Sequence, residues 1–291
     1  MSLLPAAEPP SFAGPVVAGQ LEAPPKLETS GLAASRRNPG LLWTHDDSGG
    51  AATLYAVTAE GRRLGALHLR GVKNEDWEDL AACELDGQAV IVVGDTGDND
   101  AKRPTIALHF VAEPALAELK PDTELRARPL RTLTVRYEDG PRDCEAMAVD
   151  VTERAIYLLT KRDEPPRLYR VPLDAPDGEL AVARRVGAVP HLPLLSAAQR
   201  VAKGYLGRRR GEVTALDFAP DGSAALVLTY GDLLLFPRRA GEAWAEALAR
   251  PPVRLREPAL VQAEAACFSA DGRQLFVAAE GIRTLLRYNR R

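Results

Sequence analysis

The sequence predicts an all-β protein folded as a five-bladed β-propeller, a closed ring of four-stranded blades with short helical insertions. Three observations predict this fold. A short segment with a polar first residue recurs five times, each copy is followed by a turn signal and an apolar strand, and the last copy lacks a final strand that the N-terminus can supply. Closing the ring in this way removes the exposed sheet edges of an open array.

The recurring segment begins with a polar residue and continues with small or apolar residues. Small side chains suit a place where strands crowd around a narrow axis, so we expect each copy to be the innermost strand of a blade. The copies are Ser30–Ser35, Glu78–Cys83, Glu145–Asp150, Thr214–Ala219 and Glu264–Ser269.

The other strands follow each copy in a fixed order. Turn signals such as Asp221-Gly222 and Asp271-Gly272 separate the first strand from the second. The expected second strands are rich in β-branched and aromatic residues: Leu41–Thr44, Ala89–Val93, Ala155–Thr160, Ala224–Thr229 and Gln274–Ala278. The expected third strands are Thr53–Val57, Thr105–Val111, Arg167–Val171, Leu233–Phe236 and Thr284–Tyr288. The expected fourth strands are Leu64–Leu69, Leu130–Tyr137, Ala181–Val189 and Val253–Leu255.

The last unit ends after its third strand, and we expect residues Val16–Leu21 to complete it. Residues 1–15 are rich in proline and alanine and predict a poorly ordered tail, so that residues 16–291 form a single propeller domain. Helical insertions are expected at Ala112–Lys120, Leu194–Gly207 and Gly241–Arg250.

Two other architectures are open to the same sequence. A six-bladed ring would need a degenerate blade within residues 181–212. A β-sandwich would accommodate the strands but does not explain the five-fold recurrence. A Rossmann fold is excluded, because strands and helices do not alternate and no glycine-rich phosphate loop precedes a helix.

Composition restricts the partners. The net charge of −3 provides no basic excess for binding nucleic acid. No run of about eighteen apolar residues predicts a membrane span, and the N-terminus lacks the basic and apolar regions of a signal peptide. The three widely spaced cysteines predict neither a disulfide framework nor a zinc site. We expect a monomer.

Propeller geometry predicts which polar residues lie together in a functional site. The second strand of a blade runs antiparallel to the first, so the start of one and the end of the other lie at the same face, at one mouth of the channel. Strand starts bring Ser30, Glu78, Glu145, Thr214 and Glu264 to this mouth. Strand ends bring His45, Asp46, Asp47, Asp95, Asp98, Lys161, Arg162, Tyr230, Asp232 and Glu280.

Glutamate occupies the same place in three units, at Glu78, Glu145 and Glu264. Converging carboxylates repel one another, and burial raises the penalty. A bound cation, a nearby lysine or arginine, or protonation of one carboxyl would offset the repulsion. We assign Glu78, Asp95 and Glu264 as metal ligands, and oxygen ligands alone favour Ca²⁺ or Mg²⁺ over zinc. The alternative is that the glutamates cap strand ends by accepting backbone amides.

The remaining site residues have catalytic or binding roles. Glu145 is the expected general acid or base, and Lys161 the expected partner of an anionic substrate group or a developing oxyanion. Trp77 could stack on a flat ligand or fill the core between blades. The residues expected to bind a ligand are Asp46, Trp77, Arg162 and Tyr230.

Four motifs resemble those of a group of uncharacterised bacterial β-propeller proteins, many of which look exported. They are Trp77-Glu78-Asp79-Leu80-Ala81, Gly94-Asp95-Thr96-Gly97-Asp98-Asn99, Leu42–Gly49 and Pro141–Ala146. The resemblance covers roughly residues 28–290 and implies the fold and an extracytoplasmic location, but no reaction.

The layout is more distantly similar to lactonases of the gluconolactonase type and to esterase-like phytases, which have a cation or acidic residues at the channel mouth. It is also similar to five-bladed glycosidases, which have carboxylates from three successive blades. Asp46, Asp95 and Glu145 would match those carboxylates. We therefore expect a small-ligand site, with a divalent cation such as Ca²⁺, that hydrolyses esters, lactones or phosphoesters. The alternative is a non-catalytic propeller that binds a protein or glycan, and whether the protein is an enzyme stays open.

Overall fold

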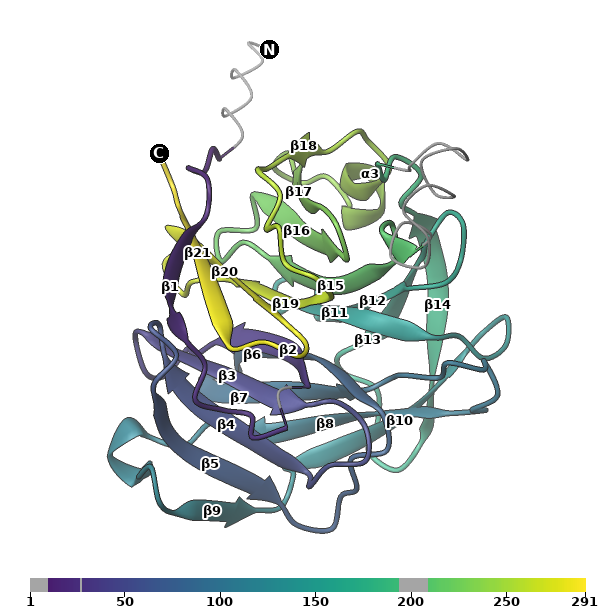
Figure 1. Cartoon of the computed structure of the whole chain (residues 1–291). Helices are drawn as coiled ribbons and strands as arrows, with labels where there is room; N and C mark the ends of the chain where they lie inside the picture. Colours follow the sequence, from purple (N-terminus) through teal and green to yellow (C-terminus); the bar gives the residue numbers. More distant parts are fainter. Residues whose placement is uncertain (1–9, 27, 194–208) are drawn as a thin grey trace.

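The computed structural model describes residues 10–26, 28–193 and 209–291, and these form four β-sheets (Figure 1). The first sheet has the order β2 (Thr29–Ala34), β3 (Leu41–Asp46), β4 (Thr53–Thr58), β5 (Arg63–Leu69) and β9 (Glu124–Ala127). Another has the order β15 (Val213–Phe218), β16 (Ala224–Thr229), β17 (Leu233–Pro237) and β18 (Val253–Arg254). A third has the order β1 (Val16–Gln20), β21 (Thr284–Asn289), β20 (Gln274–Ala279) and β19 (Ala263–Phe268).

The largest sheet joins two groups of four strands. One group is β6 (Trp77–Leu85), β7 (Gln88–Asp95), β8 (Ile106–Ala112) and β10 (Arg131–Tyr137). The other is β11 (Cys144–Asp150), β12 (Ala155–Thr160), β13 (Arg167–Pro172) and β14 (Leu180–Ala188). A parallel pairing of β10 with β14 connects them, so neither group keeps a free outer edge.

Local sequence explains the hairpins within each sheet. The strand β7 has the sequence QAVIVVGD, and most of it is buried. It is joined to β6 by Asp86 and Gly87, whose φ angles of 51° and 80° both lie in the left-handed region. An Asp-Gly pair in this conformation forms the tight turn that matches the twist of an antiparallel hairpin.

The first strands of the groups pack against one another around a common axis. Contacts run from β2 to β6, from β6 to β11, from β11 to β15, from β15 to β19 and from β19 back to β2. These strands lie near the middle of the molecule in Figure 1. Sheets arranged radially around a ring of inner strands are the architecture of a β-propeller.

Hydrophobic clusters fill the spaces between neighbouring groups of strands. Trp43 and Trp77 lie in the cluster between the β2–β5 strands and the β6–β8 strands. The rings of Phe218 and Trp244 stack at 3.7 Å in the cluster between β11–β13 and β15–β17. The core is therefore distributed around the ring between neighbouring groups of strands, and inner and second strands such as β2, β3, β12, β16 and β19 are buried on both faces.

The N-terminal strand closes the last sheet, as the sequence predicts. Strand β1 runs antiparallel to β21, with Val16 opposite Arg287 and Gln20 opposite Thr284 (Figure 1, purple beside yellow). Of the segment expected to be a tail, residues 1–9 lie outside the described residues. Phe12 forms a bridge with Arg290, and its buried ring lies 6.4 Å from that of Phe268.

The helical insertions are smaller than expected. Strand β8 continues to Ala112, and only Leu116–Glu118 form a 3₁₀ turn, because Pro114 disfavours helical backbone at the preceding residue and Ala115 is still extended. The helix expected near Trp244 is present as α3 (Trp244–Leu248). The helix expected at residues 194–207 falls outside the described residues. In the part of the chain that the structure describes, no helix is long and apolar enough to cross a membrane.

Candidate functional site

A β-bulge marks the start of every inner strand. The register with the second strand shifts at Glu78, Glu145, Thr214 and Glu264, and between Thr29 and Leu32 in the first sheet. A bulge leaves one residue out of the ladder and re-aims its side chain. The recurring polar residue of the sequence therefore lies at the bulge. Its side chain need not follow the alternation of side chains between the two faces of the sheet.

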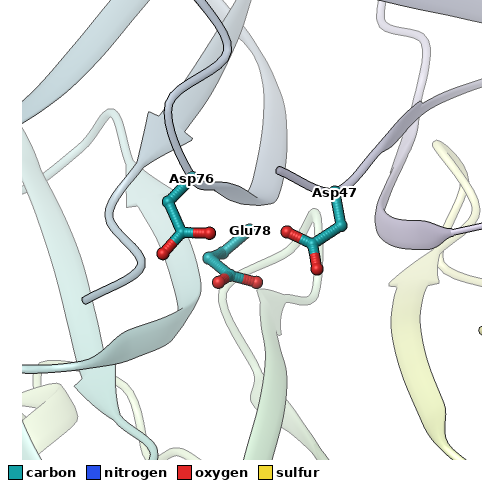
Figure 2. A group of neighbouring side chains, drawn as sticks. All are labelled: Asp47, Asp76 and Glu78. Atoms are coloured by element: carbon teal, nitrogen blue, oxygen red, sulfur yellow. The ribbon is translucent and has the colours of Figure 1, made fainter. Parts of the chain in front are cut away.

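Three carboxylates converge beside β2 and β6. They belong to Asp47, which follows β3, to Asp76, which precedes β6, and to Glu78 (Figure 2). One carboxylate oxygen from each lies within 4.8 Å of the others. We call Asp47, Asp76 and Glu78 the acidic triad. Of these residues, the sequence identified Glu78 as a metal ligand and Asp47 as a mouth residue, but it missed Asp76.

Among the described residues, no lysine or arginine forms an ion pair with the acidic triad. The triad carboxylates accept hydrogen bonds from two serines. Ser30 Oγ donates to Glu78 Oε2 at 3.0 Å, and the backbone amide of Ser48 donates to Asp47. Burial raises the pKa of Asp76 to about 6, and the charges of Asp47 and neighbouring acids add to the effect. Burial and then the charge of Glu145 raise the pKa of Glu78 well above its usual range. The charge of Arg103 opposes the rise at Asp76 and that of Lys161 opposes the rise at Glu78, although neither forms an ion pair with the triad.

Gly97 allows the carboxylates to approach one another. A Cβ atom at this position would clash with Glu78 Oε1 and would lie 2.5 Å from Asp76 Oδ2. Gly97 belongs to the Gly94–Asn99 motif, so that motif contributes to the triad through a glycine.

The acids of the same motif have partners within their own loop, and these include Asp95, which the sequence analysis expected to be a metal ligand. Asp95 Oδ1 lies 2.8 Å from Arg103 Nη2 and accepts the amide of Asp76 at 3.2 Å. Asp98 accepts the amides of Lys102 and Arg103 at 2.8 and 2.7 Å. Both carboxylates hold the loop together, as carboxylates in turns often do.

A second group of acids adjoins the triad through Glu78 and is neutralised by basic residues. Oxygens of Glu78, Asp143 and Glu145 also lie within 4.8 Å of one another. Arg162 Nε is 2.6 Å from Asp143 Oδ2, and the Lys161 ammonium forms a buried ion pair with Glu145. Burial raises the pKa of Glu145 to about 8, and the lysine charge opposes the rise.

Glu264 lies on the other side of Lys161. The Lys161 ammonium donates to the Tyr230 hydroxyl at 2.9 Å, and this hydroxyl donates to Glu264 Oε1 at 2.8 Å. Burial raises the pKa of Glu264 to about 7. Glu264, which the sequence analysis expected to be a metal ligand, is therefore a hydrogen-bond partner of Tyr230 and is not a member of the acidic triad.

Two residues expected to contact a ligand, Trp77 and Asp46, are buried and are chain neighbours of the acidic triad, but neither belongs to it. Trp77 is fully buried, between the rings of His45 at 5.7 Å and His109 at 6.3 Å, because it fills the core between two sheets. Asp46 is also buried, and burial raises its pKa to about 6, but its charged neighbours are Glu28 and Lys26.

Two aspartates, of which Asp79 is buried and Asp217 half-buried, link the inner strands below the mouth. Asp79 accepts the amides of Leu80 and Met147 at 2.8 Å and that of Leu216 at 3.3 Å, which ties β6 to β11 and β15. Asp217 accepts the amide of Phe268 at 2.8 Å, which ties β15 to β19. These carboxylates satisfy inner-strand amides that have no partner in the ladder. The sequence analysis missed both residues, although each directly interrupts an apolar inner strand.

Comparison with models of protein families finds no match for this chain, and comparison with curated proteins finds none either. Among solved structures, the chain is similar to the β-propeller domain of Cps50 (Swd1) from Myceliophteria thermophila, with 16% sequence identity and a TM-score of 0.40. The alignment covers 95% of this chain and 68% of that one. A crystal structure of the mitotic checkpoint complex is similar over 89% of this chain and 60% of that chain, with 14% identity and a TM-score of 0.39.

Proposed function

We propose that the acidic triad binds a divalent cation, Ca²⁺ before Mg²⁺, and that the mouth is the active site of a cation-dependent hydrolase of esters, lactones or phosphoesters. The observation that carries this proposal is the convergence of Asp47, Asp76 and Glu78 without a basic partner among the described residues. Among the other acids of the mouth, Asp95, Asp98, Asp143 and Glu145 have basic side chains or backbone amides as partners, whereas Glu264 accepts the Tyr230 hydroxyl and Glu280 accepts a hydrogen bond from Gln262 Nε2.

The chemistry of the donors favours a hard cation. Three carboxylates provide only oxygen ligands, which suit Ca²⁺ and Mg²⁺. Ca²⁺ takes six to eight oxygens in a flexible geometry, so water and a substrate oxygen would complete its shell. The pKa of Asp76 and of Glu78 is raised by burial first and by neighbouring acids second, and a bound cation would offset both effects by stabilising the ionised carboxylates.

The neighbouring residues would supply the rest of the reaction. A bound cation acts as a Lewis acid toward a carbonyl or phosphoryl oxygen. In this proposal Glu145, whose carboxylate lies within 4.8 Å of that of Glu78, would take a proton from an attacking water. The Lys161 ammonium, which pairs with Glu145, would stabilise a developing oxyanion.

Cation binding is tested first, by thermal unfolding of chelator-treated protein with and without Ca²⁺. At a hundredfold excess over Kd the cation should raise the free energy of unfolding by about 2.7 kcal/mol, or Tm by on the order of 5 °C. Asp76→Asn and Glu78→Gln should abolish the shift, whereas Asp122→Asn, at an exposed turn, should keep it. An equal shift in all four proteins would refute the triad as the site.

Catalysis is tested by a screen of lactones, aryl esters, phosphate esters and aryl glycosides with Ca²⁺ and with chelator. Turnover that needs the cation and is lost in Glu78→Gln supports the hydrolase. Cation binding without turnover of any class would instead favour the non-catalytic propeller that binds a protein or glycan.

We also propose that the ring has five blades. The eight-stranded sheet then consists of two blades joined at their outer edges by β10 and β14. Each of the inner strands β2, β6, β11, β15 and β19 begins one blade, and the contacts between them return from β19 to β2 without room for another inner strand. A crystal structure with a sixth inner strand on the axis would overturn this count.

A further inference from the structure

A closed ring of hydrogen bonds holds the main chain of Asp76. The Asp76 amide donates to Asp95 Oδ1 at 3.2 Å, and the Asp76 carbonyl accepts the Gly97 amide at 3.1 Å. Arg103 closes the ring, because its Nη2 donates to Asp95 Oδ1 at 2.8 Å and its Nη1 donates to the Gly97 carbonyl at 2.7 Å. The ring therefore joins the chain just before β6 to the loop that follows β7.

The loop that carries Arg103 is itself fixed. The buried Asp98 carboxylate accepts the Lys102 amide at 2.8 Å and the Arg103 amide at 2.7 Å. The Asp98 amide donates to Asp143 Oδ1 at 3.0 Å, which ties the loop to the start of β11. A guanidinium presents its donors in a rigid planar fork. Arg103 therefore reaches its two acceptors from a fixed backbone and with a fixed geometry.

We propose that Arg103 is a positioning residue of the cation site, which holds the Asp76 carboxylate beside the other two carboxylates of the acidic triad. This inference rests on the proposed function, because it assigns Arg103 a role in cation binding by the triad. Arg103 forms its ion pairs with Asp95 and with the exposed Glu75, so it acts on Asp76 through Asp95 and through the Gly97 carbonyl. Residues that orient metal ligands typically contribute about 10–100-fold to metal affinity.

The ring fixes the backbone of Asp76 and leaves its carboxylate free for a ligand. Among the described residues, none donates a hydrogen bond to this carboxylate, whereas those of Asp95 and Asp98 accept backbone amides. Gly97 sets how closely the triad can approach the loop, since a Cβ there would lie 2.5 Å from Asp76 Oδ2. Because Arg103 holds both Asp95 and Gly97, a shift of its fork would move Asp76 and the surface against which it lies.

The charge of Arg103 and its geometry predict opposite effects on cation binding. A positive charge near the site repels a bound cation, so loss of the charge alone should strengthen Ca²⁺ binding. Loss of the fork should instead release Asp76 and weaken binding. Lys102 provides the matched control, because its exposed ammonium pairs with Asp100 at 2.9 Å and lies outside the ring of hydrogen bonds.

Isothermal titration calorimetry of chelator-treated protein gives the Kd for Ca²⁺ in the wild type, Arg103→Lys, Arg103→Gln and Lys102→Met. Arg103→Lys keeps the charge but loses the fork, and it should weaken binding about tenfold. Arg103→Gln should also weaken binding, although it removes a positive charge, whereas Lys102→Met should bind at least as tightly as the wild type. Unchanged binding in Arg103→Lys with tighter binding in Arg103→Gln would mean that Arg103 acts through its charge alone and would overturn the proposal.

Luminescence of Tb³⁺, which binds to the same hard oxygen ligands as Ca²⁺, tests whether Asp76 leaves the cation. Lifetimes in H₂O and D₂O give the number of water molecules on the bound ion. The Arg103 variants should carry more water than the wild type, and Asp76→Asn should add little in their background, because the carboxylate is already displaced. Unchanged hydration in the Arg103 variants would overturn the positioning role.

Near-ultraviolet circular dichroism and the Tm of the cation-free proteins verify the fold, and either folded Arg103 variant suffices for the test. A wild-type protein that binds neither Ca²⁺ nor Tb³⁺ would refute the proposed function and the role of Arg103 together. Cation binding by the wild type with the same affinity and hydration in the Arg103 variants would refute the role of Arg103 alone. The two failures are therefore distinguishable.

Discussion

At the scale of single residues, Glu145 combines the features of a general acid or base. It begins an inner strand at a bulge, it is buried, and its pKa is raised to about 8. Environments that bring a carboxyl pKa toward neutrality equip it for proton transfer at neutral pH. Its neighbours Lys161 and Glu78 connect it to an ammonium and to the acidic triad.

Replacing Glu145 by glutamine should lower kcat by about 10²–10⁴-fold on any substrate found in the screen, because the near-isosteric amide cannot exchange the proton. Steady-state kinetics measures the effect, and circular dichroism verifies the fold. Glu280→Gln is the matched control, since Glu280 lies at the mouth in neither acidic group and accepts Gln262 Nε2 at 2.6 Å. Equal activity in Glu145→Gln and wild type would exclude Glu145 as the base.

Gly97 offers a second test at this scale. Gly97→Ala should weaken Ca²⁺ binding at least about tenfold, because the new Cβ displaces the flexible carboxylate ends of Asp76 and Glu78 rather than the backbone. Isothermal titration calorimetry gives Kd. Gly94→Ala is the control in the same motif, since its Cβ would meet neighbours only at 3.4 Å. Unchanged Ca²⁺ affinity in Gly97→Ala would show that the Gly94–Asn99 motif does not contribute to the cation site.

At the scale of elements, strand β1 determines whether the last sheet is complete. It pairs with β21, and the chain on either side of it buries Phe12 and Leu21. A large apolar side chain contributes about 1.5–3 kcal/mol when it is fully buried. The unpaired edge of β21 would also be exposed to other chains if β1 were removed.

Deleting residues 1–22 should therefore lower Tm by on the order of 5–10 °C and promote aggregation. Differential scanning calorimetry and light scattering measure these effects. Deleting residues 1–9 removes none of the contacts described here and serves as the control. An unchanged Tm in the longer deletion would show that β1 does not close the ring.

At the scale of the whole molecule, the buried carboxyls make stability depend on pH. Burial raises the pKa of Glu264 to about 7 and of Glu145 to about 8, above the values expected in the unfolded chain. The folded protein therefore binds more protons than the unfolded one between about pH 4.5 and 8, and the free energy of unfolding falls as pH rises through this window. His45, whose pKa burial lowers to about 4, opposes the trend below about pH 6.5.

The chelator-treated protein should consequently lose stability from pH 6.5 to 8, and Glu145→Gln should flatten the slope. Ca²⁺ should reverse part of the loss, because it binds ionised carboxylates and its affinity rises as Asp76 and Glu78 lose their protons. Calorimetric unfolding at several pH values, with and without Ca²⁺, measures both effects. Rising stability of the cation-free protein over this range would contradict the electrostatic account.

The sequence alone determined which segments are strands and where polar residues recur. Alternating apolar runs and Asp-Gly turns specify strands and hairpins locally, and the missing last strand pointed to the pairing of β1 with β21. The recurring polar residue marked Glu78, Glu145 and Glu264, because a position repeated in every unit occupies the same place around an axis.

Only the tertiary structure decided which of these side chains meet. Asp76 lies in an irregular loop, and its approach to Glu78 depends on the path of that loop past Gly97. The bulges at the inner strands break the two-residue alternation from which side-chain direction is read in a sequence. Trp77 directly precedes one such bulge and is buried in the core, while Glu78, one residue later, contributes its carboxylate to the triad. Strand identity is a local property, but the partners of a charge depend on chain segments that are distant in sequence.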